Sequence, residues 1–358
     1  MINLIEKVII ERNSVGSFVG RNLISSFPRE KIEVVETFKD FKFNEKKWYV
    51  ICREGKGAFL KDCPCTPNYR GCNYKVLNLI YNCYLSCTYC ILQSYLGGKI
   101  ITIFSNYEDV FKEIELYLEN RKDSLVRFGT GELSDSLFLD NITGISKNLM
   151  EFFSKKKNGV IELKTKTVKI DHLLDVKHNG RTIFAWSLNP VEIALSEEKL
   201  SPHPYLRIEA AKRAQERGFF VAFHFDPIIY YDGWLEGYSD IISKLERELD
   251  PEKVVWISMG SLRFMPSLLE FVEKEYPDSK IFYNEFIIGL DGKKRYFLPL
   301  RKKMYKVLFS KLKDIFPDVP IYFCMESDDL WEEIIGFRPK SDEEVGEYIV
   351  GKIRRMLL

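Results

Sequence analysis

Six of the eight cysteines in this chain of 358 residues fall between Cys63 and Cys90, so thiol chemistry is the first function to consider. Three of them, Cys83, Cys87 and Cys90, have the spacing C-x3-C-x2-C. In a reducing compartment, closely spaced cysteines are more often metal ligands or catalytic groups than disulfides. Paired structural zinc sites would need a second C-x2-C, which this sequence lacks. Three thiolates on a cuboidal iron–sulfur cluster leave one iron free to bind a reagent that the cluster reduces.

The elements that must position these thiols form a repeating pattern of apolar runs, each followed by an amphipathic segment. Such runs indicate buried parallel strands with helices on both faces of the sheet. About six such units fit between residues 75 and 277, so we predict an α/β fold with a partial (β/α)6 barrel. Functional residues then gather at the carboxyl ends of the strands. The predicted strands are 75–82, 124–130, 159–165, 181–188, 219–225 and 253–260, and the predicted helices are 107–118, 138–156, 204–218 and 233–249.

Three segments of the chain differ in their patterning. Residues 1–72 alternate short apolar and polar stretches, and we expect an N-terminal extension that packs on a barrel of residues 73–277. Beyond that, two predicted strands flank Asp291-Gly292, which is a strong hairpin signal, and a basic helix follows at 301–313. We therefore predict that residues 278–358 form a C-terminal β-hairpin plus helices within the same domain as the barrel.

The overall composition excludes several classes of protein. Hydrophobic residues make up 46% of the chain, which is enough for a sizeable core. With 53 Lys and Arg against 52 Asp and Glu, the net charge of +1 indicates no bulk attraction to nucleic acid. No uncharged apolar run reaches the roughly 18 residues that a membrane span needs. We expect a cytoplasmic protein without a membrane partner.

The cysteine motif C-x3-C-x-(aromatic)-C, with Tyr89 as its aromatic residue, resembles that of the radical S-adenosylmethionine (SAM) enzymes. The resemblance implies a [4Fe–4S] cluster on the three cysteines, SAM on its open iron, and an electron donor such as flavodoxin or ferredoxin. It also implies that Gly131 and Glu132, just after the second predicted strand, hold the amino group of SAM. Glycine permits close backbone approach and a carboxylate accepts bonds from an ammonium, so we predict a binding and a catalytic role for Glu132.

Longer matches resemble the spore photoproduct lyase family, the DNA-repair branch of this superfamily. They are CPCTPNYRGCNYKVLN, CTYCILQSYLGG, TKTVKIDHLLDVKHNGRT, GFFVAFHFDPIIYYDGW and GSLRF, in the same order along the chain. The resemblance implies a partial barrel of the radical SAM type and a carbon–carbon lyase. Its substrate would be a thymine photoproduct in damaged DNA.

Five further residues acquire expected roles from this resemblance. Lys166 is similar to the family lysine that meets the SAM carboxylate, and Ser134 to a serine nearby. Ser187 and Asn189, in WSLNP, resemble polar residues that line the cofactor pocket. Arg263, in GSLRF, resembles the arginine that approaches the lesion, and we predict a catalytic role for it.

The segment from Lys293 to Lys313 predicts a nucleic-acid contact. It carries nine Lys or Arg and no acidic residue, and these are interleaved with Tyr296, Phe297 and Tyr305. Basic residues neutralise phosphates, and aromatics stack on extruded bases. The hairpin with Lys293, Lys294 and Arg295 also resembles the family element that enters distorted duplex DNA. Against this, a basic helix face is usually only solvated.

The sequence departs from the family at two positions. The family donates a hydrogen atom from a cysteine after the second strand, where this chain has Glu132, and it has tyrosine where this chain has Ile91. Neither replacement offers a weak S–H or phenolic O–H bond, so the hydrogen relay or the reaction must differ. The candidate replacements are Tyr81, Tyr84, Tyr95 and Cys324.

Two alternatives to lesion repair remain open at this point. One is an enzyme of the same family that modifies RNA, a peptide or a small molecule. The other is an iron–sulfur or zinc protein that binds nucleic acid without catalysis, although a pure binder needs no SAM pocket.

The remaining chemistry-bearing residues also allow two interpretations each. We expect a packing role for Cys63, Cys65 and Cys72, with a second metal centre completed by Cys52 or Cys324 as the alternative. His224 lies beside Asp226 at a strand end, where it could act as an acid–base group or as a hydrogen-bonded core imidazole.

Overall fold

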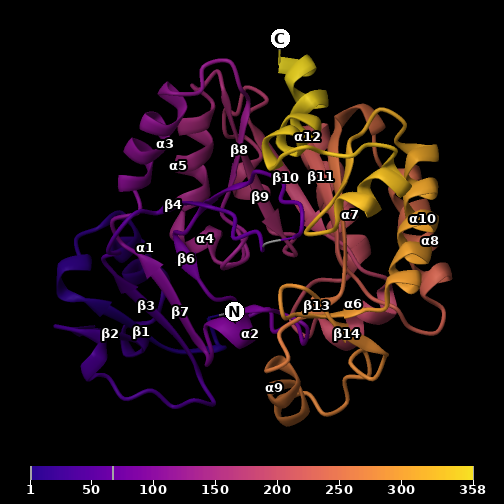
Figure 1. Ribbon diagram of the computed structural model, residues 1–358. Helices are drawn as coiled ribbons and strands as arrows, with labels where there is room; N and C mark the ends of the chain where they lie inside the picture. Colours follow the sequence, from indigo (N-terminus) through magenta and orange to yellow (C-terminus); the bar gives the residue numbers. More distant parts are fainter. Residues whose placement is uncertain (1, 67, 358) are drawn as a thin grey trace.

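The computed structural model describes residues 2–66 and 68–357, and its largest sheet is the curled, barrel-like one in Figure 1. Its strand order is β16-β12-β11-β10-β9-β8-β5-β4, and all neighbours are parallel except β4 and β5. The predicted α/β partial barrel is confirmed. The strands are β4 (Leu60–Asp62), β5 (Lys75–Leu77), β8 (Val126–Gly129), β9 (Gly159–Thr165), β10 (Thr182–Ser187), β11 (Phe220–Ile228), β12 (Val254–Ser261) and β16 (Ile321–Phe323).

Helices cover the outer face of this sheet, as the connections between parallel strands require (Figure 1). Among residues 2–66 and 68–357, none of them has the length and apolar character that crossing a membrane demands. The helices are α1 (Phe18–Ser26), α2 (Leu92–Tyr95), α3 (Asp109–Glu119), α4 (Asp140–Thr143), α5 (Ile145–Phe153), α6 (Val191–Glu197), α7 (Pro204–Glu216), α8 (Trp234–Glu248), α9 (Leu268–Glu275), α10 (Leu298–Ile315), α11 (Asp328–Leu330) and α12 (Asp342–Leu357).

Two predicted elements are each divided in the structure. The expected helix 138–156 is α4 followed by α5, because Gly144 between them adopts a left-handed φ of 69°. The expected strand 75–82 is β5 followed by β6 (Ile80–Tyr81), and these two strands belong to different sheets. The chain therefore changes sheets immediately before the first cysteine of the motif.

A second sheet has the order β2-β1-β3-β7-β6 and is formed by segments on both sides of residue 72. Strands β6 and β7 are antiparallel, so the segment between them, residues 82–99, is the connection of a wide hairpin. We call this segment the cluster loop. The strand pairing crosses the predicted boundary at 72, and β16 crosses the one at 277 by joining the barrel sheet. The strands not yet given are β1 (Ile5–Glu11), β2 (Ile32–Val35), β3 (Trp48–Arg53) and β7 (Ile100–Phe104).

The predicted hairpin around Asp291-Gly292 is confirmed. It forms a small sheet in the order β13-β15-β14, with Gly292 at a left-handed φ of 75° in its turn. Because β13 follows directly after β12, this sheet is fixed to the carboxyl end of the barrel (Figure 1). Its strands are β13 (Arg263–Phe264), β14 (Phe286–Ile288) and β15 (Lys294–Tyr296).

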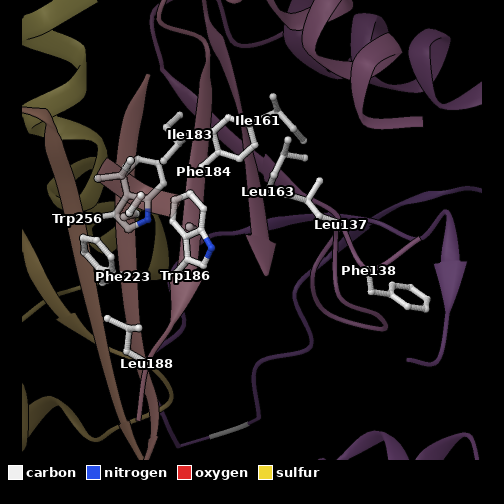
Figure 2. Close-up of a cluster of buried hydrophobic side chains, with 14 of the residues drawn as sticks. Leu137, Phe138, Ile161, Leu163, Ile183, Phe184, Trp186, Leu188, Phe223 and Trp256 are labelled. Atoms are coloured by element: carbon white, nitrogen blue, oxygen red, sulfur yellow. The ribbon is translucent and has the colours of Figure 1, made fainter. Parts of the chain in front are cut away.

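The core between barrel and helices is large and aromatic. Figure 2 shows Phe184, Trp186 and Phe223 from the neighbouring strands β10 and β11 among its buried side chains. The indole Nε1 of Trp186 donates to the carbonyl of Thr167, 2.9 Å away, which fixes the chain just after β9. Apolar packing on this side thus holds the strand ends from which the site residues project.

Register places polar side chains in a row inside the barrel. Ser187, His224, Ser258 and Tyr322 are successive partners across β10, β11, β12 and β16. Because side chains alternate between the two faces of a strand, these four share the inner face. The barrel interior is therefore polar near its carboxyl end, where a site is expected.

Candidate active site

A cavity of about 240 Å³ lies at the carboxyl ends of the barrel strands, and the cluster loop forms one of its walls. The structure brings together nearly all of the predicted site residues here. Those lining the cavity are Cys83, Cys87, Tyr89, Cys90, Gly131, Glu132, Ser134, Lys166, Ser187 and Arg263.

The cluster loop is closed at its base by one asparagine. The amide Nδ2 of Asn82 donates to the carbonyls of Gly98 and Ile100, at 3.2 and 3.1 Å, and its Oδ1 accepts from the backbone N–H of Cys83. Asn82 and Ser86 both have left-handed φ values, 72° and 54°, so the backbone turns sharply on both sides of the first cysteine. This curvature makes the loop wrap around the cavity.

The three thiols of the motif face the same cavity from different points of the loop. Burial raises the pKa of Cys87 to about 12, and the nearby ammonium of Lys166 offsets only part of this increase. Burial also raises the pKa of Cys90, while backbone N–H groups directed at its sulfur lower it. The backbone N–H of Leu85 lies 3.4 Å from the sulfur of Cys83. Such N–H groups stabilise metal-bound thiolates, so the loop fits an iron–sulfur cluster.

The thiols do not form a site for a single small ion. In the part of the chain that the structure describes, no three Cys, His, Asp or Glu side chains converge tightly enough for that. A cuboidal cluster is wider than one ion and needs ligands spread around it.

Glu132 is held against a lysine that sequence reasoning missed. The Nζ of Lys164 lies 2.7 Å from Oε1 of Glu132. Burial alone would lower the pKa of Lys164, but the charge and hydrogen bond of Glu132, together with the charges of Glu162 and Asp226, raise the pKa overall. Gly131 permits this approach, because a Cβ there would lie only 2.8 Å from the Cβ of Lys164. The sequence could have indicated Lys164 as well, because it lies two residues before Lys166 at a strand end and residues i and i+2 of a strand point to the same face.

Ser134 connects the loop that follows β8 to the cluster loop by a hydrogen bond. Its hydroxyl donates to the carbonyl of Asn82 at 2.8 Å, and the backbone N–H of Asn82 donates to the carbonyl of Leu133 at the same distance. The next residue, Asp135, accepts from the backbone N–H of Lys166 at 2.7 Å. These bonds couple the cysteines, Glu132 and Lys166 into one framework.

Asn189, a predicted cofactor contact, does not line this cavity. Its Nδ2 donates to Oε1 of Glu198 at 3.0 Å and to the hydroxyl of Tyr89 at 3.2 Å, and its Oδ1 accepts from Tyr238 at 2.8 Å. Asn189 follows the end of β10, two residues after Ser187, and only Ser187 lines the cavity. Its amide is fully engaged in this buried network.

Arg263 forms a two-point ion pair at the far wall of the cavity. Its Nη1 and Nη2 lie 3.1 and 3.2 Å from the two carboxylate oxygens of Asp226, and Nη2 also lies 3.2 Å from the sulfur of Cys324. Burial would raise the pKa of Asp226, but Arg263 outweighs it and the pKa is lowered. The pairing with Asp226 therefore fixes the guanidinium of Arg263 at the boundary between this cavity and the barrel interior.

A second cavity, of about 520 Å³, lies deeper in the barrel and shares Glu132, Lys164, Asp226 and Arg263 with the first. Of the candidate hydrogen donors, Tyr95 and Cys324 line it, whereas Tyr81 and Tyr84 line neither cavity. Other lining residues include Cys63, Cys72, Tyr74, Arg127, Lys293 and Tyr322. The hydroxyl of Tyr74 is buried against the backbone near Gly129 and has no hydrogen-bond partner among the described residues.

His224 is hydrogen-bonded on both ring nitrogens. Nδ1 lies 2.7 Å from the hydroxyl of Ser258, and Nε2 lies 2.6 Å from Oε1 of Glu162. Burial would raise the pKa of Glu162, but His224 and Arg127 lower it to about 2. Of the two interpretations offered for His224, the geometry favours the hydrogen-bonded core imidazole.

The expected basic surface of the hairpin and α10 is partly neutralised by acidic residues. Lys293 and Arg295 are buried against Asp291, with N–O distances of 3.7 and 2.6 Å. Lys302 and Lys306 both pair with Glu333, and Arg301 is buried beside Glu326. Lys293 and Arg295 are therefore engaged with Asp291, whereas Lys294, Lys303 and Lys311 have no ion-pair partner among the described residues. The predicted contact of this segment with DNA stays a prediction.

The exposed part of the hairpin is apolar instead. Ile288 is 69% exposed and Leu290 is 77% exposed, and Tyr283 beside the hairpin is 76% exposed. Singly exposed apolar residues are common on protein surfaces, but here two lie on one hairpin with a third just before it.

Comparison with known proteins gives consistent results. The spore photoproduct lyase family profile matches residues 68–324. The chain is 31% identical to the spore photoproduct lyase of Bacillus subtilis (strain 168) over 232 residues, 64% of this chain and 66% of that protein. It is 26% identical to that of Clostridium acetobutylicum over 288 residues, 78% of this chain and 85% of that protein. The match to the Geobacillus protein spans 62% of that protein's length.

Solved structures show the same fold. A spore photoproduct lyase complexed with dinucleoside spore photoproduct aligns with a TM-score of 0.77 at 23% identity, covering 89% of this chain and 98% of that one. A variant of that enzyme with bound AdoMet and the same dinucleoside aligns with a TM-score of 0.77, also at 23% identity, covering 88% and 98%.

Proposed function

Since the chain belongs to the spore photoproduct lyase family of the radical SAM superfamily, we propose that it repairs a thymine photoproduct in DNA by radical chemistry. The observation that carries this proposal is the single cavity shared by Cys83, Cys87, Cys90, Glu132 and Lys166. A three-thiol site beside a carboxylate and an ammonium matches the needs of a cluster and an amino acid cofactor.

The protein's own groups bind and orient the cofactors. The three cysteines would hold a [4Fe–4S] cluster, Glu132 would accept bonds from the amino group of SAM, and Lys166 would pair with its carboxylate. When bound, the cluster and SAM supply a 5′-deoxyadenosyl radical after one-electron reduction by a flavodoxin or ferredoxin. The surrounding barrel excludes water from this chemistry and fixes the distance to substrate.

The lesion would occupy the larger cavity beyond Arg263. This cavity adjoins the cofactor site, its volume suits a pair of bases, and polar side chains such as Arg263 and Lys293 line it. The apolar tip formed by Ile288 and Leu290 would enter the opened duplex, as apolar wedges do between base steps. DNA contact then depends on this wedge more than on a basic surface.

The experiment is anaerobic incubation with SAM, dithionite and ultraviolet-irradiated DNA, followed by analysis for 5′-deoxyadenosine and restored thymine. We expect the wild-type protein to form both, and Cys87→Ala to form neither because the cluster loses a ligand. Formation of 5′-deoxyadenosine by Cys87→Ala would refute the assignment of the cluster site.

A second candidate is an enzyme of this family that acts on RNA, a peptide or a small molecule. It is favoured by Glu132 and Ile91, which stand where the family has hydrogen-relay residues. Formation of 5′-deoxyadenosine without restored thymine would select this candidate. Complete absence of SAM cleavage in protein that contains iron and sulfide would select a binding function without catalysis.

A further inference from the structure

Two adjacent buried glutamates at the end of α6, Glu197 and Glu198, lie directly against the cluster loop. The backbone of Glu198 forms an antiparallel bridge with Cys87, and the N–H of Thr88 donates to the carbonyl of Glu197 at 2.9 Å. The hydroxyls of Thr88 and Tyr89 donate to the carboxylates of Glu197 and Glu198, respectively. Each residue between the second and third cysteines is thus held by one glutamate.

The two carboxylates differ in how their charge is balanced. Glu197 accepts from two hydroxyls, those of Thr88 and Ser279. Glu198 forms an ion pair with Arg207, and both side chains are 0% exposed. Burial would raise the pKa of Glu198, but Arg207 and Lys166 outweigh it and the pKa is lowered. Glu198 and Arg207 therefore form a fully buried ion pair next to the cavity, and loss of the carboxylate charge would leave the guanidinium unpaired.

The charge of Glu198 reaches two groups that face the cavity. The Nζ of Lys166 lies 5.8 Å from the centre of the Tyr89 ring, whose hydroxyl is bonded to Glu198. Burial would lower the pKa of Lys166, but Glu198 and Cys87 outweigh it and the pKa is raised.

We infer that Glu198 is a positioning residue, which orients Tyr89 and Lys166 for the cofactor and places a negative charge behind the cluster ligand Cys87. This inference rests on the proposed function, because it requires a cluster on Cys87. The carboxylate of Glu198 offsets the positive charge of Arg207, so compared with a neutral residue at this position it disfavours the addition of an electron nearby and lowers the reduction potential of the cluster. Through Lys166 it also strengthens the binding of SAM.

The experiment compares Glu198→Gln with Glu192→Gln, an exposed glutamate on the same helix. Iron content, the midpoint potential from an anaerobic titration followed by electron paramagnetic resonance, and SAM binding are measured for each. We expect Glu198→Gln to contain as much iron as wild type, to have a higher midpoint potential, and to bind SAM about tenfold more weakly. Glu192→Gln should match wild type in all three.

Two further variants separate charge from geometry. Glu198→Asp keeps the charge, so its midpoint potential should stay near that of wild type. Tyr89→Phe removes the hydroxyl but not the charge, so SAM binding should weaken while the potential changes little. If Glu198→Gln does not fold or does not bind iron, these two variants decide: a shifted potential in Glu198→Asp, or unchanged SAM binding in Tyr89→Phe, overturns the inference.

The failure of the inference is distinct from the failure of the proposed function. A Glu198→Gln protein with wild-type iron, potential and SAM binding overturns the inference and leaves the cluster assignment intact. A wild-type protein that takes up no iron and sulfide on reconstitution overturns the proposed function itself.

Discussion

At the scale of single residues, the site consists of charges held in pairs across two cavities. Glu132 is paired with Lys164, and Asp226 with Arg263, at N–O distances between 2.7 and 3.2 Å. Each pair belongs to both cavities. Charged groups that are pre-oriented in this way need no reorganisation when a charged cofactor arrives.

Glu132 should determine the affinity for SAM. We expect Glu132→Gln to raise the KM for SAM roughly tenfold, because an amide binds the cofactor's ammonium less well than a carboxylate and leaves Lys164 unpaired. Steady-state formation of 5′-deoxyadenosine measures this effect. The exposed Glu119→Gln on α3 is the control and should keep the wild-type KM.

Cys324 is the thiol best placed to replace the family's missing hydrogen donor. It lines the larger cavity and contacts Arg263 at 3.2 Å. We expect Cys324→Ala to retain 5′-deoxyadenosine formation while restored thymine falls at least about tenfold, because the product radical then lacks a nearby S–H. Product analysis with irradiated DNA measures both. If the amount of restored thymine falls in Cys63→Ala but not in Cys324→Ala, the hydrogen donor is Cys63 instead.

At the scale of elements, the hairpin β14–β15 and the cluster loop are both fixed by long-range contacts. The cluster loop is anchored in one sheet at β6 and β7 and is pressed against α6 of the barrel. The hairpin is tied to the barrel end through β13, with its apolar tip left in solvent. The cluster loop therefore forms part of the cavity wall, and the hairpin projects into solvent.

The hairpin tip should matter only for long substrates. We expect Leu290→Asp to reduce repair of lesions in duplex DNA roughly tenfold, since a charged group cannot replace an apolar wedge between base steps. Repair of an isolated dinucleoside photoproduct should be unchanged. Leu116→Asp on α3, another exposed leucine, is the matched control. Equal losses on both substrates would show that the tip supports the active site and not DNA binding.

At the scale of the whole molecule, one buried network joins most of the barrel strands. Glu162 of β9 contacts His224 of β11, Trp256 of β12 and Arg127 of β8, and Arg127 in turn contacts Tyr322 of β16. The barrel is open, so no continuous ring of strands closes it. This polar network provides cross-strand links in its interior instead.

Acid should destabilise the protein through this network. The pKa of Glu162 is about 2 in the folded protein, against an ordinary value near 4.5, so its stabilisation is present above pH 4.5 and is lost as pH falls toward 2. We expect the free energy of unfolding to drop by about 3 kcal/mol from this group alone. Denaturant unfolding at several pH values measures it, and Glu162→Gln should be less stable at neutral pH with a flatter dependence on acid.

Local sequence patterns determined much of this protein. The cysteine spacing, the alternation of apolar runs with amphipathic segments, and Asp291-Gly292 in a turn depend only on neighbouring residues, and they correctly predicted the barrel, the hairpin and the three thiols of one cavity. The collinear family motifs brought Glu132, Lys166 and Arg263 to the same place.

Only the tertiary structure decided which charges are free. The sequence of Lys293 and Arg295 suggested a basic surface, yet both are buried against Asp291, and Arg301, Lys302 and Lys306 of α10 pair with Glu326 and Glu333 from later in the chain. Likewise, Asn189 turns away from the cavity into a network with Glu198, which no motif indicated. Charge pairing and burial depend on residues that are distant in sequence and adjacent only after folding, so no local pattern contains them.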